Sequence, residues 1–490
     1  MLLIKIPQLL IGKSFSASVF ATLMGAGLSR AITLASMAFI SRIYAAEAYG
    51  SWIIILSLVT FVMPLATLRY DLAIVLAVTR RMSAGIGCAI LTQSFLLSCV
   101  CFLALTLLPV RAIEAISGLA ATQQKFLLLL PIVIFLSAAN TVFQAWSNRE
   151  RNFWGVALSI TLQAIVTAAL TLGLPLFFGP SGWTAAAAAI TGITTAVGVL
   201  AFQSSEFFYQ SLERPFLVRA AWHGIRRYQV YAVLGIPYAI SAVLTERIQQ
   251  LLITNYYGIG TLASLFVVRQ IIMGPTSIVA GSLRQTVFAF GAQQDSLETL
   301  RKRVLTILRI MILAVGPALA FGLAWIKPSV AILMGPKWPY LAEFSFWTLL
   351  PASMLVLTGW IDRVLDIYGK QRMALWLQLA SDFCVIGLAF AGARYGLVAV
   401  QLVEVISIAI ASYNLIWLFV ALTLLSTPKE QVIQLFSQLL VSFGFWIIVQ
   451  QLVIIYAPLR IALPISIVVG LLSLLPAFPR LSHVLRNGIN

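Results

Sequence analysis

The sequence predicts an all-α, polytopic membrane protein, and three observations support this fold class. Of its 490 residues, 61% are hydrophobic and 10% are charged, against about 45–50% and about 25% in soluble domains. Fourteen apolar stretches are each long enough to cross a bilayer, which takes about 20 residues. Only short polar connections separate these stretches. The pattern excludes a water-soluble globular protein, a disordered chain and a small disulfide-linked scaffold.

The apolar stretches predict about 14 transmembrane helices. The first stretch is longer than the apolar core of a secretory signal, carries Arg30 in its middle and is followed at once by a second span. We therefore expect it to be retained as the first helix and not cleaved. The predicted spans are 14–41, 49–68, 84–108, 126–146, 153–176, 183–205, 229–254, 260–289, 304–326, 341–364, 373–393, 396–424, 432–456 and 459–478.

Basic residues in the connections predict the orientation of the chain. Lys and Arg total 32 and Asp and Glu total 15, which gives a net charge of +17. In a soluble chain, this excess of basic residues would suggest binding to nucleic acid. Beside membrane spans, basic residues instead indicate the orientation of the chain and contact with anionic lipid, so no nucleic-acid partner is expected. Alternate connections hold nineteen and seven basic residues, and both chain ends belong to the richer set. The N- and C-termini are therefore predicted to be cytoplasmic.

Two pairs of similar segments predict an internal repeat. One pair follows the fourth and tenth spans with two basic residues each, and the other ends the second and eighth spans. The segments are Arg149/Arg151 with Lys370/Arg372, and Ala66–Arg69 with Gly281–Arg284. Both pairs relate spans six helices apart, and an even displacement keeps the same orientation across the membrane. A parallel duplication follows, of a kind common in transporters.

The repeat predicts the domain organisation. We expect a six-helix lobe in residues 1–205 and a second in 229–424, with a central cleft between them. Residues 206–228 form a cytoplasmic linker that carries four basic residues. Two extra transmembrane helices and a C-terminal tail occupy 425–490.

Arginines in or beside the spans predict a substrate-binding site. A charged side chain at the membrane centre costs about 2.5–3.5 kcal/mol on insertion scales, so it needs a partner or a water-filled cavity. Arginine suits phosphate or pyrophosphate because its planar guanidinium binds oxygens bidentately and keeps its charge. The predicted cationic cavity is formed by Arg30, Arg69, Arg247, Arg269 and Arg284. The alternative is that Arg69 and Arg284 are interfacial anchors and that Arg269 snorkels to the membrane surface.

Acidic residues in or beside the spans are candidates for coupling transport to an ion gradient. A desolvated carboxylate can load and release a proton or bind sodium, although Asp382 and Glu404 could equally be structural partners of the cavity arginines. Neighbours on a helix point about 100° apart, so Glu246 and Arg247 each need a partner on another helix or water. The candidate ion-coupling residues are Asp71, Glu246, Asp382 and Glu404. The segment Asp362–Asp366 predicts a local ion pair of Arg363 with Asp366.

The sequence contains few residues that point to an enzyme. The cysteines Cys88, Cys99, Cys101 and Cys384 lie in apolar stretches without CxxC spacing, so we assign neither a metal site nor a disulfide. No Walker, HExxH or GxSxG motif is present. We expect no cofactor and no enzymatic activity. A membrane-embedded polymerase or glycosyltransferase would need acidic or histidine clusters on a sizeable outer loop, whereas the predicted outer connections are short.

Three stretches resemble the polysaccharide transporter family, which belongs to the multidrug/oligosaccharidyl-lipid/polysaccharide (MOP) flippase superfamily. The most specific is Leu68-Arg69-Tyr70-Asp71-Leu72-Ala73-Ile74-Val75-Leu76, and the others are Leu28-Ser29-Arg30 and the turn from Ser41 to Gly50. Many relatives carry Glu where this chain has Asp71. Arg30 and Arg69 are the cavity arginines that match the family's pattern.

The resemblance implies a function in the bacterial inner membrane. Such a flippase moves undecaprenyl-pyrophosphate-linked oligosaccharide units to the outer face for O-antigen, capsule or exopolysaccharide synthesis. The implied mechanism is alternating access between two lobes, driven by a proton or sodium gradient. The implied partners are the lipid-linked oligosaccharide, membrane lipids and other polysaccharide-assembly proteins. Alternative functions are a multidrug or lipid II exporter of the same superfamily, or a membrane-embedded polymerase or glycosyltransferase.

Overall fold

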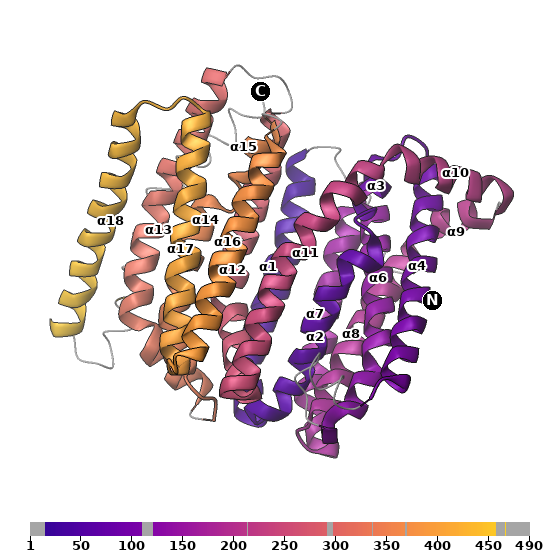
Figure 1. The fold of residues 1–490 in the computed structure, drawn as a ribbon, viewed down its shortest axis with the longest axis horizontal. Helices are drawn as coiled ribbons and strands as arrows, with labels where there is room; N and C mark the ends of the chain where they lie inside the picture. Colours follow the sequence, from indigo (N-terminus) through magenta and orange to yellow (C-terminus); the bar gives the residue numbers. More distant parts are fainter. Residues whose placement is uncertain are drawn as a thin grey trace. The chain divides into compact units, whose positions relative to one another are not determined.

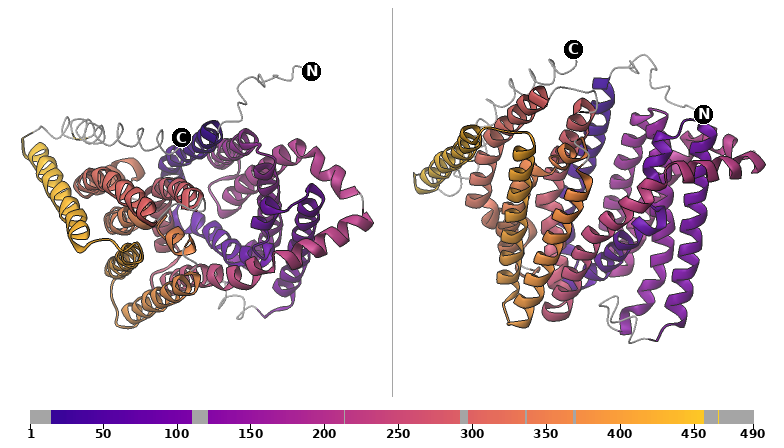
Figure 2. Two further views of the ribbon diagram at one scale, coloured as in Figure 1. Left: turned by 90° about the horizontal axis from the view of Figure 1, so that it is seen from above. Right: turned by 45° about the horizontal axis from the view of Figure 1, so that its top comes forward.

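The fold is helical throughout the part of the chain that the computed structural model describes, which confirms the predicted all-α class. These residues are 15–109, 121–212, 214–291, 297–335, 337–367, 370–456 and 466. Figure 1 shows the long helices of each part of the chain running side by side. The left view of Figure 2 shows them from above.

Twelve helices in the described residues are long and apolar enough to cross a membrane. The chain is therefore a multi-pass membrane protein. The helices that contain these spans are α1 (Phe15–Ile43), α2 (Ala46–Thr67), α4 (Arg80–Leu107), α6 (Leu130–Arg149, preceded by the 3-10 helix η2, Ala121–Leu129), α7 (Phe153–Phe178), α8 (Gly182–Gln203), α12 (Ile259–Gly291), α13 (Leu297–Met334), α14 (Leu341–Thr358), α16 (Gln371–Arg394), α17 (Ala399–Leu424) and α18 (Lys429–Tyr456).

The predicted spans match these helices with three exceptions. The seventh, 229–254, is the long helix α11 (Gln229–Tyr257), which is not among the twelve because its second half carries the polar run Thr245–Gln250. The tenth, 341–364, is wrong at its end, since α14 stops at Thr358 and a short helix α15 (Asp362–Ile367) follows. All but one residue of the fourteenth span, 459–478, lies outside the described residues.

Shorter helices lie between the spans. Helix α3 (Asp71–Leu76) follows α2 directly, and the predicted linker contains α9 (Ser205–Leu212) and α10 (Arg214–Arg227). Hydrogen bonds from side chains fix several helix starts: the Thr79 hydroxyl accepts from the backbone N–H of Met82 at 3.2 Å, and Ser181 and Thr184 form a capping box at α8.

The chain forms two compact units, Met1–Leu251 and Leu252–Asn490. A cluster of buried side chains from α3, α4, α6, α8 and α9 forms a core in the first unit, including Ile74, Val142 and Phe207. A core in the second unit combines residues of α13 to α18, with Trp360 and Val364 of the α14–α15 region fully buried. The predicted lobe boundaries and the internal repeat stay predictions.

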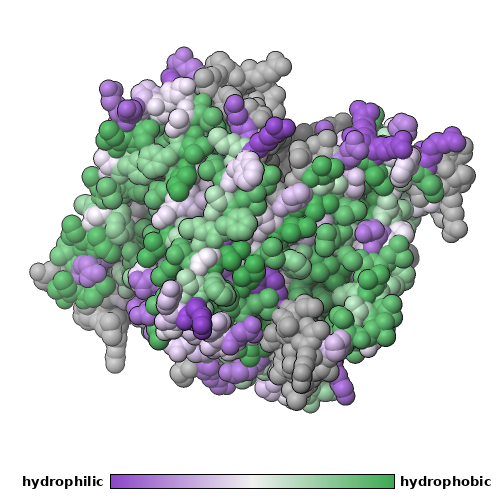
Figure 3. Space-filling view, viewed as in Figure 1, coloured by the Kyte–Doolittle hydropathy of each residue, from purple (hydrophilic) through white to green (hydrophobic). Residues whose placement is uncertain are grey.

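Large apolar side chains cover the surfaces of the long helices. On α4, Phe95, Val100 and Leu107 are 56%, 63% and 74% exposed. Figure 3 shows hydrophobic side chains over most of the visible helices, with hydrophilic ones gathered mainly near helix ends. Water would penalise apolar patches of this extent, whereas lipid does not.

Helices α1 and α7 approach each other closely at Gly25. A Cβ atom added to Gly25 would lie 2.5 Å from Cβ and 2.6 Å from Cα of Ala157, whereas the same atom on Gly27 would meet nothing within 4 Å. The contact at Gly25 includes backbone, so a side chain there cannot be accommodated by a rotamer change alone. Small residues commonly allow such close packing between membrane helices.

We expect Gly25→Ala to lower the free energy of unfolding by about 1–3 kcal/mol, because the added methyl group forces α1 away from α7. The matched control is Gly27→Ala, which should be neutral or stabilising by up to about 1 kcal/mol because alanine favours helix. Thermal unfolding of both variants in the same detergent measures the difference. Equal melting temperatures would contradict the close contact.

Candidate functional site

A break between α2 and α3 positions Arg69. Leu68 and Arg69 both adopt left-handed backbone conformations, with φ of 46° and 58°. For residues other than glycine this costs about 1–2 kcal/mol each. The break is held by the backbone N–H of Tyr70, which donates to Thr67 O at 3.0 Å, and by that of Arg69, which donates to Thr67 Oγ1 at 3.3 Å.

The break turns the Arg69 side chain onto α11. A Cβ atom added to Gly235 of α11 would lie 3.7 Å from both Cβ and Cγ of Arg69, which is ordinary van der Waals contact, so the arginine packs against α11 at this position. The Nε of Arg69 is buried and has no hydrogen-bond partner among the described residues. A buried donor without a partner is costly, and an anionic ligand would satisfy it.

Asp71 lies two residues further, at the start of α3. Burial raises the pKa of the Asp71 carboxyl above its ordinary value, and the positive charge of Arg69 opposes this shift only in part. The carboxyl of Asp71 therefore takes up a proton more readily than a solvated aspartate does.

Arg247 projects from α11 onto the middle of α2. Its Nη1 donates to the hydroxyl of Ser57 at 2.6 Å, and the whole residue is only 5% exposed. Its sequence neighbour Glu246 is exposed and accepts a hydrogen bond from Gln250 at 3.4 Å. The two charges thus face different surroundings, as their positions on the helix require.

Arg30 of α1 is half-buried, and its sequence neighbour Ser29 lines a polar cavity that sequence reasoning missed. The cavity measures about 270 Å³ between α1, α2 and α7. Its polar lining comes from Ser29, Thr33 and Ser36 of α1, Tyr49 of α2, and Gln163, Thr167 and Thr171 of α7. The signal was present in the sequence, because these hydroxyl and amide residues recur every three or four positions on α1 and α7.

In the second unit, Arg284 of α12 forms an ion pair with Asp362 of α15. The pairing joins the end of one long helix to the short helix that follows α14. The side chains of Arg363 and Asp366, for which a local pair was predicted, lie outside the described residues. Arg269 is half-buried on α12.

Asp382 of α16 is buried and accepts a hydrogen bond from a side-chain amide. Its Oδ1 accepts from Gln378 Nε2 at 3.0 Å, and the Tyr413 hydroxyl of α17 donates to Gln378 Oε1 at 2.9 Å. The chain Tyr413–Gln378–Asp382 therefore links two membrane-spanning helices through a carboxylate. Glu404 is half-buried on α17.

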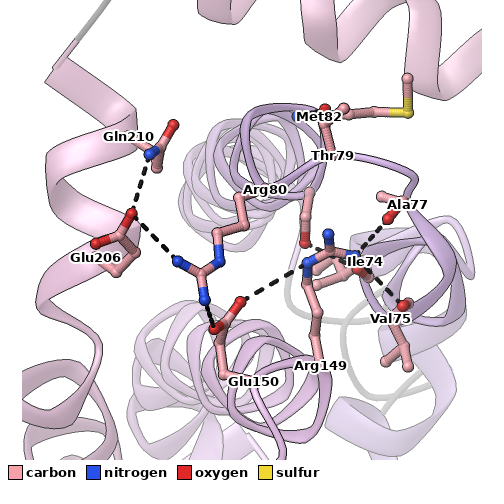
Figure 4. A network of polar contacts seen from close by, with 11 residues as sticks. Ile74, Val75, Ala77, Thr79, Arg80, Met82, Arg149, Glu150, Glu206 and Gln210 are labelled. Atoms are coloured by element: carbon pink, nitrogen blue, oxygen red, sulfur yellow. Dashed lines mark hydrogen bonds and ion pairs between the residues drawn. The ribbon is translucent and has the colours of Figure 1, made fainter.

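A second polar network, shown in Figure 4, ties the end of α3 to α4, α6 and α9. Arg149 at the end of α6 donates to the carbonyls of Val75 and Ala77, which end α3. Arg80 pairs with Glu150 at 2.7 Å and approaches Glu206 at 3.8 Å. From sequence, Arg149 counted as a basic residue of a connection and as part of the internal repeat, because nothing local shows that α3 and α6 meet.

The sequence analysis assigned neither a metal site nor a disulfide, and the described residues bear on both. They contain no group of three or more His, Cys, Asp or Glu side chains placed to hold a metal ion. The four cysteines are free thiols.

No protein-family model matches the chain, and no curated protein matches its sequence. Solved structures of MOP-superfamily transporters share its fold. An inward-facing multidrug resistance MATE transporter superposes with a TM-score of 0.64 at 14% identity and covers 83% of this chain and 98% of its own. A MOP transporter from Pyrococcus furiosus Vc1 (DSM3638) gives 0.57 at 13% identity, over 86% and 97%.

The lipid II flippase MurJ, in an inward closed conformation, is similar over a larger part of this chain. Its TM-score is 0.67 at 13% identity, and the match covers 96% of this chain and 99% of MurJ. The TM-scores of 0.64 and 0.67 show a shared fold at sequence identities of 13–14%. The chain thus has the fold of the MATE and MurJ transporters.

We expect Arg149→Gln to lower the free energy of unfolding by about 1–3 kcal/mol, because the buried carbonyl of Ala77 loses its charged donor. The control is Arg151→Gln at a nearby exposed position of the same connection. Thermal unfolding in detergent compares the two. An equal effect of both changes would show that Arg149 acts only as a surface charge.

We expect Asp71→Asn to weaken the pH dependence of stability. Because the folded-state pKa of Asp71 is raised, wild-type stability should fall as the pH rises from 3.8, the ordinary value, through the raised value. The asparagine variant lacks this titration, so it should gain stability relative to wild type as the pH rises. Melting curves at pH 4 and 7 test this, with the exposed Glu47→Gln as control, and an unchanged difference between Asp71→Asn and wild type would contradict it.

Proposed function

We propose that the chain is a flippase that moves undecaprenyl-pyrophosphate-linked oligosaccharide units across the bacterial inner membrane, with both termini in the cytoplasm. The observation that carries this proposal is the extent of the fold similarity. MurJ, which is described as a lipid II flippase, matches 96% of this chain, whereas the MATE transporter matches 83%. The fold of a flippase for a lipid-linked substrate therefore covers more of this chain than the fold of the multidrug transporter does.

The chemistry of the arginines supports a pyrophosphate as the group that is gripped. Arg69 has a buried Nε without a partner, and guanidinium groups bind phosphate oxygens bidentately. Arg247 and Arg284 are bound to Ser57 and Asp362 in this conformation. We propose that these partners are exchanged for phosphate oxygens when the transporter opens, while the isoprenoid tail stays in lipid.

Asp382 is our first candidate for coupling transport to a proton or sodium gradient, because its carboxyl is buried in a membrane-spanning helix and is joined through Gln378 to Tyr413 of a second one. Asp71, Glu246 and Glu404 remain further candidates. Among these, Asp71 has a carboxyl whose pKa burial raises.

A multidrug or lipid II exporter is the second candidate function, since the similar structures include multidrug transporters and MurJ itself. A positively charged binding surface disfavours cationic drugs as substrates. A membrane polymerase or glycosyltransferase has weaker support. Sugar transfer by the purified protein would be the evidence in its favour.

Deletion of the gene separates these functions. Accumulation of undecaprenyl-linked repeat units together with loss of surface polysaccharide supports the flippase and identifies its substrate. Accumulation of lipid II, or drug sensitivity with normal surface polymer, favours the exporter.

We expect Arg30→Ala and Arg247→Ala to abolish surface polysaccharide at unchanged protein level, because each removes a cation that the proposed site uses. Arg394→Ala, at an exposed position on α16, is the control and should complement the deletion. Polymer staining and quantitative blotting measure both quantities. Normal polymer from both variants would refute the assignment of these arginines.

A further inference from the structure

A groove about 460 Å³ in volume lies between α13 and α18 of the second unit. Its lining consists of Arg309 and Leu313 from α13, and Ser437, Gln438, Val441, Ser442 and Phe445 from α18. One of these residues is charged, three are uncharged and polar, and three are apolar.

Three contacts hold together the two helices that form the groove. At one end, Arg309 Nη2 donates to Gln434 Oε1 of α18 at 3.3 Å. Further along, a Cβ atom added to Gly316 would lie 2.4 Å from Ser442 Oγ, so the helices touch there. Beyond that point the buried Trp325 donates to Gln450 Oε1 at 3.1 Å. These contacts fix the groove between the helices.

The polar end of the groove is positively charged. Arg309 is exposed, and within the described residues its hydrogen bond goes to a neutral amide and it forms no ion pair with a carboxylate. Ser437 and Gln438 are exposed beside it. The Gln438 amide can donate a hydrogen bond, while the Ser437 hydroxyl donates to Gln434 O at 2.9 Å in this conformation. Leu313, Val441 and Phe445 offer an apolar surface further along the groove.

The surroundings of the groove are lipid. Both helices contain candidate membrane spans, and only 6% of the span of α18 is buried within the protein. Arg309 lies seven residues after Lys302, which is about 11 Å along a helix axis. Lys302 belongs to a connection that the charge pattern assigns to the cytoplasmic side. An arginine at this depth reaches the level of lipid phosphates.

We propose that this groove binds one anionic phospholipid of the cytoplasmic leaflet. The phosphate contacts Arg309, Ser437 and Gln438, and one acyl chain lies over Leu313, Val441 and Phe445. An anionic phospholipid has a charged head joined to an apolar tail, so it matches a groove with one cationic end and one apolar end. The lipid fills the space beside the contact of α18 with α13.

Native mass spectrometry tests this site with the full chain in detergent, titrated with phosphatidylglycerol or phosphatidylcholine. Arg309→Gln should reduce retention of phosphatidylglycerol about fivefold, which is the contribution of one basic residue near a membrane surface. Arg372→Gln, an exposed cation on α16 that is predicted to lie on the same side, is the matched control and should retain phosphatidylglycerol like wild type.

A second variant keeps the charge and fills the groove. Val441 is 71% exposed, so Val441→Trp can fold while its indole occupies the space of the acyl chain. Loss of phosphatidylglycerol in both variants supports the proposal. Loss in Arg309→Gln alone would mean that a free anion binds and would overturn the lipid site. Retention in both variants, or equal retention of phosphatidylcholine by wild type, would also overturn it.

Discussion

Polar groups inside a bilayer need partners within the protein, and the whole structure depends on this constraint. Helices satisfy it for the backbone, which is why the described spans are helical. Side chains satisfy it by pairing across helices. Arg247 reaches Ser57 on α2, and Asp382 is connected through Gln378 to α17. A polar residue in a span therefore requires a neighbouring helix that supplies its hydrogen-bond partner. The arrangement of helices in each unit follows from these hydrogen bonds as well as from apolar packing.

The two helix breaks have a common local structure. After α2 the backbone N–H of Tyr70 donates to Thr67 O, and after α14 that of Ile361 donates to Thr358 O. Each break is followed by a six-residue helix that begins with an aspartate, Asp71 in α3 and Asp362 in α15. Both short helices are held by fully buried aliphatic residues of the cores. The buried aliphatic residues keep each short helix packed in a core. Charged residues can therefore lie at the break without unfolding the long helix that precedes it.

The sequence predicted the helices well and the site only in part. Apolar stretches report membrane crossings directly, so the described spans were found with small errors at their ends. The end of α14 was missed, because Gly359 alone does not show that a helix stops. The ion pair of Asp362 with Arg284 was not predicted, since ion pairing across helices depends on which helices pack together. The left-handed conformation of Leu68 and Arg69 could not be predicted from the sequence either, because residues other than glycine adopt it only where tertiary contacts impose it.

The contact of Arg149 with α3 has a consequence for how the chain is made. The carbonyls of Ala77 and Val75 are synthesised 72 and 74 residues before the guanidinium that satisfies them. At the usual rates of translation this interval lasts roughly 4 to 15 s. During it the end of α3 has no donor from the protein and must stay hydrated at the membrane surface. The first four spans must therefore be synthesised before this contact between α3 and α6 can form.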